Sequence, residues 1–217
     1  MTGKTHLVVG TALASGLLLL NHNTSNSEII TTSIVLSALG AILPDIDIEH
    51  SLMRKVFYGT ILAIGIMIGL IFYSNINPKS LINWNEVTVP IIIGACGFIG
   101  LLMYGYFSSH RTFTHTLLAL ILFSLSIYMI CNNLAYTMYF AIGMLSHQLL
   151  DMLNKERIYW LNPITKKDFA LYSINSSGTT STMMFVVGLL VTICFTNQLS
   201  IKKTKKYLKY LNLLHEI

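Results

Sequence analysis

Seven apolar runs divide the 217 residues of this chain, and none of them contains Asp, Glu, Lys or Arg. Apolar residues make up 53% of the chain and charged residues 11%, whereas a soluble domain is about a quarter charged. In a bilayer, every backbone polar group must be hydrogen-bonded within the chain, which favours helices. We therefore predict an all-α, polytopic helical membrane protein with six to seven membrane-embedded helices. The runs are residues 6–20, 29–43, 56–74, 87–107, 116–131, 136–150 and 182–196.

The runs differ in length, and the shorter ones carry polar residues at or beside one end. Residues 56–74 and 87–107 are long enough to cross about 30 Å of hydrocarbon. The first, second, fifth and sixth runs have only fifteen or sixteen residues, and each has His or Asp near one end. Short helices with polar ends indicate a site that is recessed into one membrane face and lined by protein.

Four histidines and three aspartates gather at these ends. Ionisable groups at membrane depth are costly, so they indicate function. Imidazole and carboxylate are ligands that zinc or manganese prefers. When the runs are counted as crossings, all seven residues fall at one membrane face or within one helical turn of it. We predict that they form one metal site, made of His6, Asp45, Asp47, His110, His115, His147 and Asp151.

Two of the motifs have informative spacing. His147 and Asp151 are four residues apart, so on a helix they share one face and can reach one ion. Pro44 disfavours helix at the residue before it, so we expect the second helix to end at about residue 43 and Asp45 and Asp47 to lie on an extended exit segment. Alternate residues of such a segment point in opposite directions. One aspartate would then bind the first metal, and the other would bind a second metal or orient a histidine.

The string SSHRTFTHT opens the fifth run. His110 and His115 can point into one cavity if the first lies before the helix and the second within it, with Thr112 or Thr114 as the N-cap. Arg111 lies between them and suits a phosphate group held by two hydrogen bonds. A positively charged anchor at the cytoplasmic boundary is an equal alternative for Arg111.

Fewer sequence features support a ligand role for the remaining histidines. His6 begins the first run and adds a nitrogen ligand to the predicted site, although a lone histidine at a membrane boundary is more often an interfacial residue. His50 and Glu49 are close enough in sequence to the Asp pair to participate.

Positive charge predicts the orientation. The connections on the side of the motifs contain eight lysines and arginines, whereas the opposite connections contain only Lys79, so the site should face the cytoplasm. Residues 1–200 are predicted to form a single integral-membrane domain, followed by a basic amphipathic tail over residues 201–217. After seven crossings this tail would lie outside, against the rule, unless the last run is re-entrant or interfacial.

The motifs together resemble one known family. They are MTGKTHLVVG at the start, the LPDID segment with a following Ser51, the HRTFTHT block, and the SHQLLDMLN block followed by an aromatic and proline-containing segment. With these blocks, which span most of the chain, it resembles the YdjM-type family of bacterial inner-membrane proteins. The resemblance implies a membrane-bound metal-dependent hydrolase located in the inner membrane.

The predicted function is hydrolysis at the membrane. We expect a divalent metal ion, zinc or manganese, that acts on a phosphoester of a membrane lipid or a lipid-linked substrate. Asp47 is predicted as a ligand or, when it does not bind the ion, as the proton acceptor, and Arg111 as the phosphate-binding residue. A transporter or ion-handling protein, and a structural protein whose metal staples the helices, are the alternatives. Because basic and aromatic residues do not interleave, no nucleic-acid partner is expected.

Overall fold

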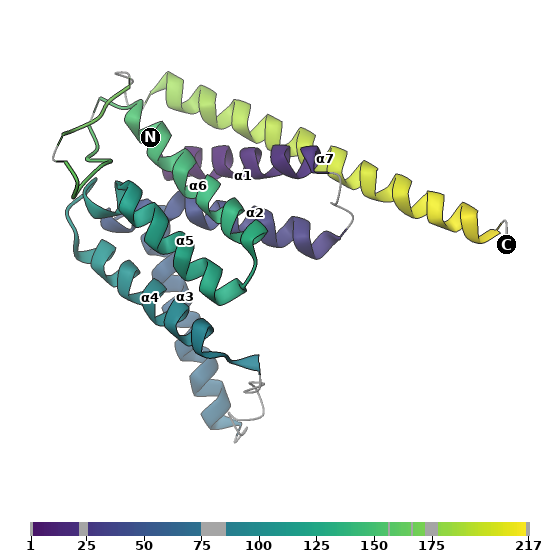
Figure 1. Cartoon of the computed structure of the whole chain (residues 1–217), viewed down its shortest axis with the longest axis horizontal. Helices are drawn as coiled ribbons and strands as arrows, with labels where there is room; N and C mark the ends of the chain where they lie inside the picture. The colour runs from purple at the N-terminus through teal and green to yellow at the C-terminus, as the bar shows by residue number, and fades with distance from the viewer. Residues whose placement is uncertain are drawn as a thin grey trace.

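The computed structural model describes residues 2–21, 26–74, 86–155, 157–165, 167–171 and 178–215, with the backbone alone for Phe72 and residues 206–215. Within these ranges the regular elements are helices joined by loops and turns, apart from an isolated bridge between Ile158 and Phe169. The elements in chain order are α1 (Gly3–Leu20), α2 (Ser27–Ile42), the 3-10 helix η1 (Leu43–Asp47), α3 (Leu52–Tyr73), α4 (Val89–Phe107), the 3-10 helix η4 (Phe113–His115), α5 (Leu117–Cys131), α6 (Leu134–Met152) and α7 (Thr179–His215) (Figure 1).

Each predicted run corresponds to one of the helices, so the predicted all-α fold is confirmed. Five helices are long and apolar enough to cross a membrane: α1, α2 with η1, α3, α4 and α7. The fifteen residues of α5 form a shorter apolar helix. Helix α6 has nineteen residues but carries buried polar side chains, among them His147, Gln148 and Asp151.

Hydroxyl and amide side chains begin several helices. The Thr2 hydroxyl accepts a hydrogen bond from the backbone N–H of Thr5 at the start of α1, and Asn133 does the same for Tyr136 in α6. Thr116 caps α5, since its Oγ1 accepts a hydrogen bond from the Ala119 N–H at 3.0 Å. The predicted cap at Thr112 or Thr114 is therefore wrong. The chain forms the 3-10 turn η4 first, and this turn delays the start of α5.

Two glycines bring α2 and α6 into backbone contact. A Cβ atom at Gly143 would lie 2.0 Å from the Ser37 carbonyl oxygen, and one at Gly40 would lie 2.2 Å from the Phe140 carbonyl oxygen. Small residues at such a crossing let two membrane helices approach closely. Because His147 lies one turn after Gly143, this contact places its ring against the end of α2.

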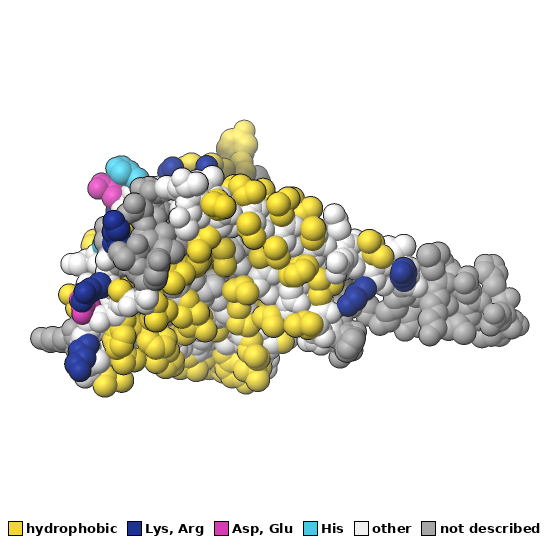
Figure 2. Space-filling view, turned by 90° about the horizontal axis from the view of Figure 1, so that it is seen from above, with side chains coloured by type: hydrophobic (Ala, Val, Ile, Leu, Met, Phe, Trp, Pro, Cys, Tyr) yellow, Lys and Arg dark blue, Asp and Glu magenta, His cyan; other side chains and the backbone are white. Residues whose placement is uncertain are grey.

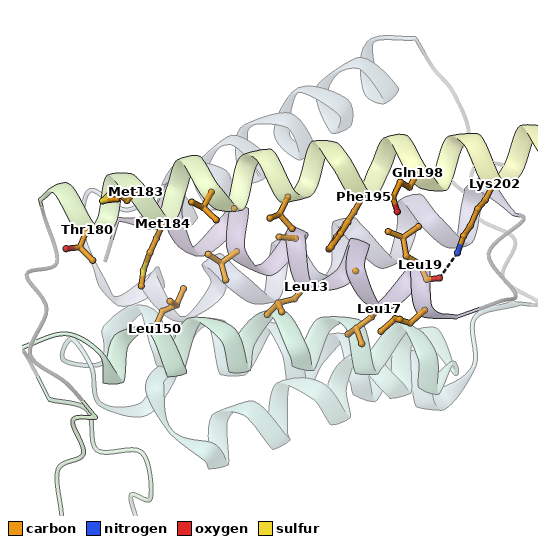
Figure 3. A pocket seen from close by; sticks show the side chains of 17 residues that line it. Leu13, Leu17, Leu19, Leu150, Thr180, Met183, Met184, Phe195, Gln198 and Lys202 are labelled. Atoms are coloured by element: carbon orange, nitrogen blue, oxygen red, sulfur yellow. Dashed lines mark hydrogen bonds between the residues drawn. The ribbon is translucent and has the colours of Figure 1, made fainter.

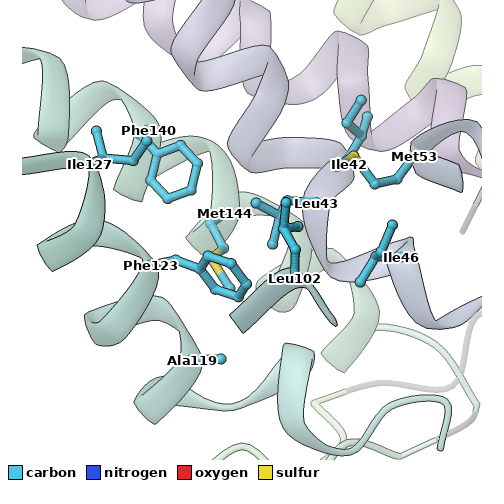
Figure 4. Packing of buried hydrophobic residues seen from close by; sticks show 10 residues of the cluster. All are labelled: Ile42, Leu43, Ile46, Met53, Leu102, Ala119, Phe123, Ile127, Phe140 and Met144. Carbon is cyan, nitrogen blue, oxygen red and sulfur yellow. The ribbon is translucent and has the colours of Figure 1, made fainter. Parts of the chain in front are cut away.

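An apolar cluster packs against the elements that carry the His and Asp side chains (Figure 4). It joins residues of α2 and η1 to residues of α3, α4, α5 and α6. Ile46 lies between Asp45 and Asp47 and is fully buried in this cluster. Since adjacent side chains of the turn point in different directions, its burial turns the two aspartates away from the apolar core. The buried members are Ile42, Leu43, Ile46, Met53, Leu102, Ala119, Phe123, Ile127, Phe140 and Met144.

Helices α3 and α7 lie at the periphery. Helix α3 packs mainly on η1, and most of its apolar side chains are exposed. Helix α7 packs along α1 and then extends beyond the other helices (Figure 1). Its 37 residues correspond to about 55 Å, which exceeds the roughly 30 Å thickness of the hydrocarbon. It continues across residue 200 without a break, and the side chains that would make the tail amphipathic lie outside the described part.

The surface is divided as a membrane protein requires. Figure 2 shows hydrophobic side chains over the middle of one face, with Lys and Arg, Asp and Glu, and His side chains at one end. Further Lys and Arg side chains lie toward the other end, where the tail begins. Such an apolar band between two charged ends matches the hydrocarbon and headgroup layers of a bilayer.

Candidate metal centre

Four elements deliver His and Asp side chains to one buried cluster. His6 comes from the first turn of α1, Asp45 and Asp47 from η1, His115 from η4, and His147 and Asp151 from α6. All six are buried, and the three histidines are fully buried. Segments far apart in the sequence therefore meet at the ends of the helices.

Asp151 is surrounded by three imidazoles. Its Oδ1 lies 3.3 Å from His6 Nε2, and its Oδ2 lies 3.2 Å from His115 Nε2 and 3.7 Å from His147 Nε2. Asn154 holds the carboxylate in place, since its Nδ2 donates a 2.8 Å hydrogen bond to Oδ1. The i, i+4 spacing of His147 and Asp151 thus places both on one face of α6, at the centre of the cluster.

The hydrogen bonds of His147 fix which of its nitrogens carries the proton. Its Nδ1 lies 2.7 Å from the Ala41 carbonyl oxygen at the end of α2. A carbonyl oxygen can only accept, so Nδ1 donates, and the neutral ring has a lone pair on Nε2. That Nε2 lies 3.4 Å from Asp45 Oδ1 and faces the cluster.

A hydroxyl relay orients His115 in the same way. Thr114 Oγ1 donates its single proton to Asp47 Oδ2 at 3.0 Å. The same oxygen therefore accepts the 3.0 Å hydrogen bond from His115 Nδ1. The neutral His115 ring is left with its lone pair on Nε2.

The two lone pairs face each other. His115 Nε2 and His147 Nε2 are 3.3 Å apart, and when both rings are neutral the hydrogen bonds described above leave no proton between them. Carboxylate oxygens of Asp45 and Asp151 approach the same two nitrogens. A cation at this point would be attracted by all four groups, so the donor set and its orientation fit a metal ion such as zinc or manganese.

His6 gives an independent indication. Its ring stacks on His147 with centroids 3.8 Å apart. Its buried Nδ1 has no hydrogen-bond partner, and its buried Nε2 has only the 3.3 Å contact with Asp151 Oδ1. A buried polar atom without a partner requires an explanation. The full burial of His6 argues against a residue at the membrane interface. His6, His147 and Asp151 form one group with metal-ligand spacing, and Asp45, His115 and His147 form a second.

Asp47 and His110 form an outer layer beside these groups. Asp47 accepts hydrogen bonds from His110 Nδ1 at 3.1 Å and from the backbone N–H of Arg111 at 3.0 Å, besides the bond from Thr114. His110 is partly exposed, and its Nε2 accepts a hydrogen bond from Arg111 Nε at 3.2 Å. Both residues lie outside the two ligand groups found among the described residues. Their assignment as metal ligands stays a prediction.

The segment that carries the two aspartates differs from the prediction. Helix α2 ends at Ile42, close to the predicted boundary, but Leu43–Asp47 forms a 3-10 helix, so the predicted extended segment is wrong. Pro44 lies in the first turn of η1, where a missing N–H costs nothing. Asp45 faces His147 and Asp47 faces His110, so the two side chains still serve different partners.

Arg111 is buried at the edge of the cluster. Its Nη2 lies 3.7 Å from Asp151 Oδ2. Its backbone has φ 62°, a left-handed conformation that is uncommon for a residue other than glycine. This turn directs the backbone N–H to Asp47. With neutral imidazoles, the charge of Arg111 is exceeded by the three carboxylates, which a divalent cation would offset.

Several positioning residues were not predicted from the sequence. Gln148 is fully buried, donates to the Thr116 carbonyl oxygen at 3.0 Å, and accepts from Trp160 Nε1 at 3.0 Å. Gln148 thereby connects α6 to the segment that joins η4 to α5 and to the loop that follows α6. Arg54 donates to the Ile46 carbonyl oxygen at 2.9 Å and holds η1 in place. These residues bear no metal-ligand pattern, and only the position of Gln148 beside His147 could have indicated it.

His50 and Glu49 are exposed and do not join the cluster. His22 and the side chain of His215 lie outside the described residues.

Comparisons with known proteins agree with the motifs. No curated protein and no solved structure matches the chain. The family model described as YdjM inner membrane protein matches residues 1–214, nearly the whole chain. The chain therefore belongs to the YdjM inner membrane protein family.

Proposed function

We propose that this protein is a membrane-bound metal-dependent hydrolase that cleaves a phosphoester of a lipid or lipid-linked substrate at the cytoplasmic face. One observation carries the proposal: the lone pairs of His115 Nε2 and His147 Nε2 face each other in a buried cluster that also contains Asp45 and Asp151. Polar groups arranged in this way at a membrane face are costly without a function.

The two groups of His and Asp side chains indicate which residues would bind the metal ion. His115, His147, Asp45 and Asp151 would hold the ion, and His6 would add a nitrogen from α1. Zinc is the favoured ion and manganese the alternative, because the donors are imidazole and carboxylate. When bound, a divalent ion supplies Lewis acidity toward a phosphoryl oxygen and makes water a better nucleophile.

Arg111 and Asp47 support the site in different ways. Arg111 would bind the phosphate, since guanidinium pairs with phosphate oxygens through two parallel hydrogen bonds. Asp47 was predicted as a proton acceptor, but donors from His110, Arg111 and Thr114 already occupy its carboxylate. Its geometry favours a positioning role, in which it orients His115 and the Arg111 backbone.

The membrane face follows from charge. The site side contains Lys4, Arg54, Lys55, Arg111, Lys155, Arg157, Lys166 and Lys167, and excess positive charge marks cytoplasmic connections. A site at the ends of membrane helices meets lipid headgroups directly, which favours a lipid substrate. A transporter would be expected to bind its cargo near the bilayer midplane.

One observation favours a second candidate. The donor side chains are so completely buried that a closed, structural metal site, which staples the helix ends, is the alternative. Catalytic sites keep one coordination position open, and structural sites do not.

An activity assay distinguishes a catalytic metal site from a structural one. Purified protein, loaded with zinc or manganese, is assayed for release of phosphate or of the phosphorylated headgroup from phosphatidic acid, phosphatidylglycerol and a polyprenyl pyrophosphate in mixed micelles. We expect hydrolysis of at least one of them, and a loss of about 10²–10³-fold in kcat/KM for Arg111→Lys, a range typical of removing one oriented donor. His50→Ala, outside the cluster, should match the wild type. Metal-loaded protein that hydrolyses none of these esters would favour the structural role.

A further inference from the structure

A long apolar groove runs beside the metal centre, between α1 and α7 (Figure 3). It encloses about 1070 Å³, and Leu150 of α6 contributes to one side. Helix α1 forms the floor with Val9, Ala12, Leu13 and Gly16, and α7 forms a wall. The residues on that wall are Thr180, Met183, Met184, Val187, Gly188, Val191, Phe195, Gln198 and Lys202.

The packing of α7 explains why the groove exists. Helix α7 packs mainly along α1. It approaches α1 where glycines allow it: Phe195 lies over Gly16, and Gly188 lies against Val8. In the protein alone, Met183 is 62% exposed and Val187 is 58% exposed, so the groove opens toward the surrounding hydrocarbon.

The groove has polar residues only at its two ends. Thr180 lies at one end, and Gln198 and Lys202 lie at the other (Figure 3). Lys202 donates a hydrogen bond from Nζ to the Leu19 carbonyl oxygen at 2.8 Å, which places its charge at the far end. The lining between these ends is apolar.

The near end of the groove lies at the depth of the metal centre. Val9 is one helical turn from His6 on α1, and Leu150 directly precedes Asp151 on α6. Thr5, next to His6, has its hydroxyl 3.2 Å from that of Ser181, next to Thr180. From Val9 to Leu20 the axis of α1 rises about 17 Å, at about 1.5 Å per residue. This is close to half of the roughly 30 Å hydrocarbon thickness, the depth that one acyl chain occupies.

We propose that this groove binds the hydrocarbon chain of a lipid whose phosphate headgroup lies at the metal centre. The assignment rests on the proposed function and extends it to the part of the substrate that is not cleaved. At membrane depth, the groove is surrounded by lipid. An apolar channel of one-leaflet length that begins beside the proposed phosphate-binding site matches a single-headed amphiphile. Binding of a remote chain would also position the ester at the centre.

Photolabelling tests the groove. The protein is reconstituted in vesicles of phosphatidylethanolamine and phosphatidylglycerol that contain a trace of phosphatidylglycerol with a diazirine in the middle of one acyl chain. The sample is transferred to detergent and irradiated, and adducts are mapped by mass spectrometry. We expect adducts on Met183, Val187 and Val191 at about tenfold the level on α3, whose exposed face is the internal reference.

Two neighbouring valines provide a matched pair. Val187→Phe places a ring in the groove and should lower the α7 adducts about tenfold. Val186 is also exposed on α7 but does not line the groove, so Val186→Phe should label like the wild type. Unchanged metal content in both variants shows that they are folded.

The outcomes separate the groove from the activity. Equal labelling of Val187→Phe and wild type, or no excess on α7 over α3, overturns the groove assignment. Because labelling requires no catalysis, intact labelling without hydrolysis overturns the proposed function and leaves the groove assignment in place.

Discussion

At the scale of single residues, neutral groups orient the histidine side chains of the buried cluster. The Ala41 carbonyl and the Thr114 hydroxyl determine which nitrogens of His147 and His115 face the cluster. Asp47 completes this layer by accepting a hydrogen bond from the Thr114 hydroxyl. Partners of this kind commonly change metal affinity by about 10–100-fold when they are removed.

Thr114 allows this layer to be tested without touching a ligand. Thr114→Val keeps the shape but removes the relay, so His115 and Asp47 each lose a buried partner. We expect metal affinity to fall about 10–100-fold and the free energy of unfolding to fall by about 1–3 kcal/mol. Competition with a chelator and thermal unfolding in detergent measure the two effects. Thr114→Ser keeps the hydroxyl and should restore both, and wild-type affinity in Thr114→Val would contradict the relay.

The sequence indicated most residues of the buried cluster but not the residues that support them. The His147–Asp151 spacing identifies a shared helix face, and the structure brings both side chains into one cluster. Thr114 and Gln148 could not be found in this way. They are uncharged, and their partners depend on how η1, η4 and α6 meet. The left-handed backbone at Arg111 likewise results from tertiary contacts with Asp47 and not from local propensity.

At the scale of elements, the contact between α2 and α6 determines where His147 lies in the site. The seven apolar runs were sufficient to predict the helices, because each buries its backbone polar groups internally. They could not predict the close approach at Gly143 and Gly40, which depends on the mutual rotation of two helices. This approach places the Nδ1 of His147 against the Ala41 carbonyl.

Adding one methyl group tests that contact. Gly143→Ala would place a Cβ atom 2.0 Å from the Ser37 carbonyl oxygen, so the helices must separate. We expect a loss of about 1–3 kcal/mol of stability from overpacking, together with weaker metal retention because His147 moves. Gly65 on α3 has open space around it. Gly65→Ala should therefore be neutral or stabilise by up to about 1 kcal/mol. Equal thermal stability and metal content of the two variants would contradict this role of the contact.

At the scale of the whole molecule, the site and the basic end of α7 lie at opposite ends of the apolar band. Helix α7 is long enough to cross the bilayer and leave it. The positive-inside rule is then satisfied at the site and violated at the tail. Because orientation is set by the overall balance of Lys and Arg close to the membrane, we predict that the site faces the cytoplasm.

Single cysteines test this topology after Cys96, Cys131 and Cys194 are replaced by Ala. Lys167→Cys lies on the site side, and Lys205→Cys lies beyond the groove on α7; both positions are exposed. A membrane-impermeant maleimide added to intact spheroplasts should label Lys205→Cys alone, and inverted vesicles should show the reverse. Labelling of Lys167→Cys from outside would overturn the cytoplasmic assignment. Labelling of both positions only in inverted vesicles would show that α7 does not cross.

The most direct test of the account is the metal content of the detergent-purified protein, measured by elemental analysis. Wild type is compared with His115→Ala and His147→Ala, and with His50→Ala as an exposed histidine outside the cluster. We predict stoichiometric zinc or manganese in wild type and His50→Ala, and its loss from both cluster variants while they remain inserted in the membrane. Wild-type protein without metal after reloading, or cluster variants that retain it, would contradict the metal centre.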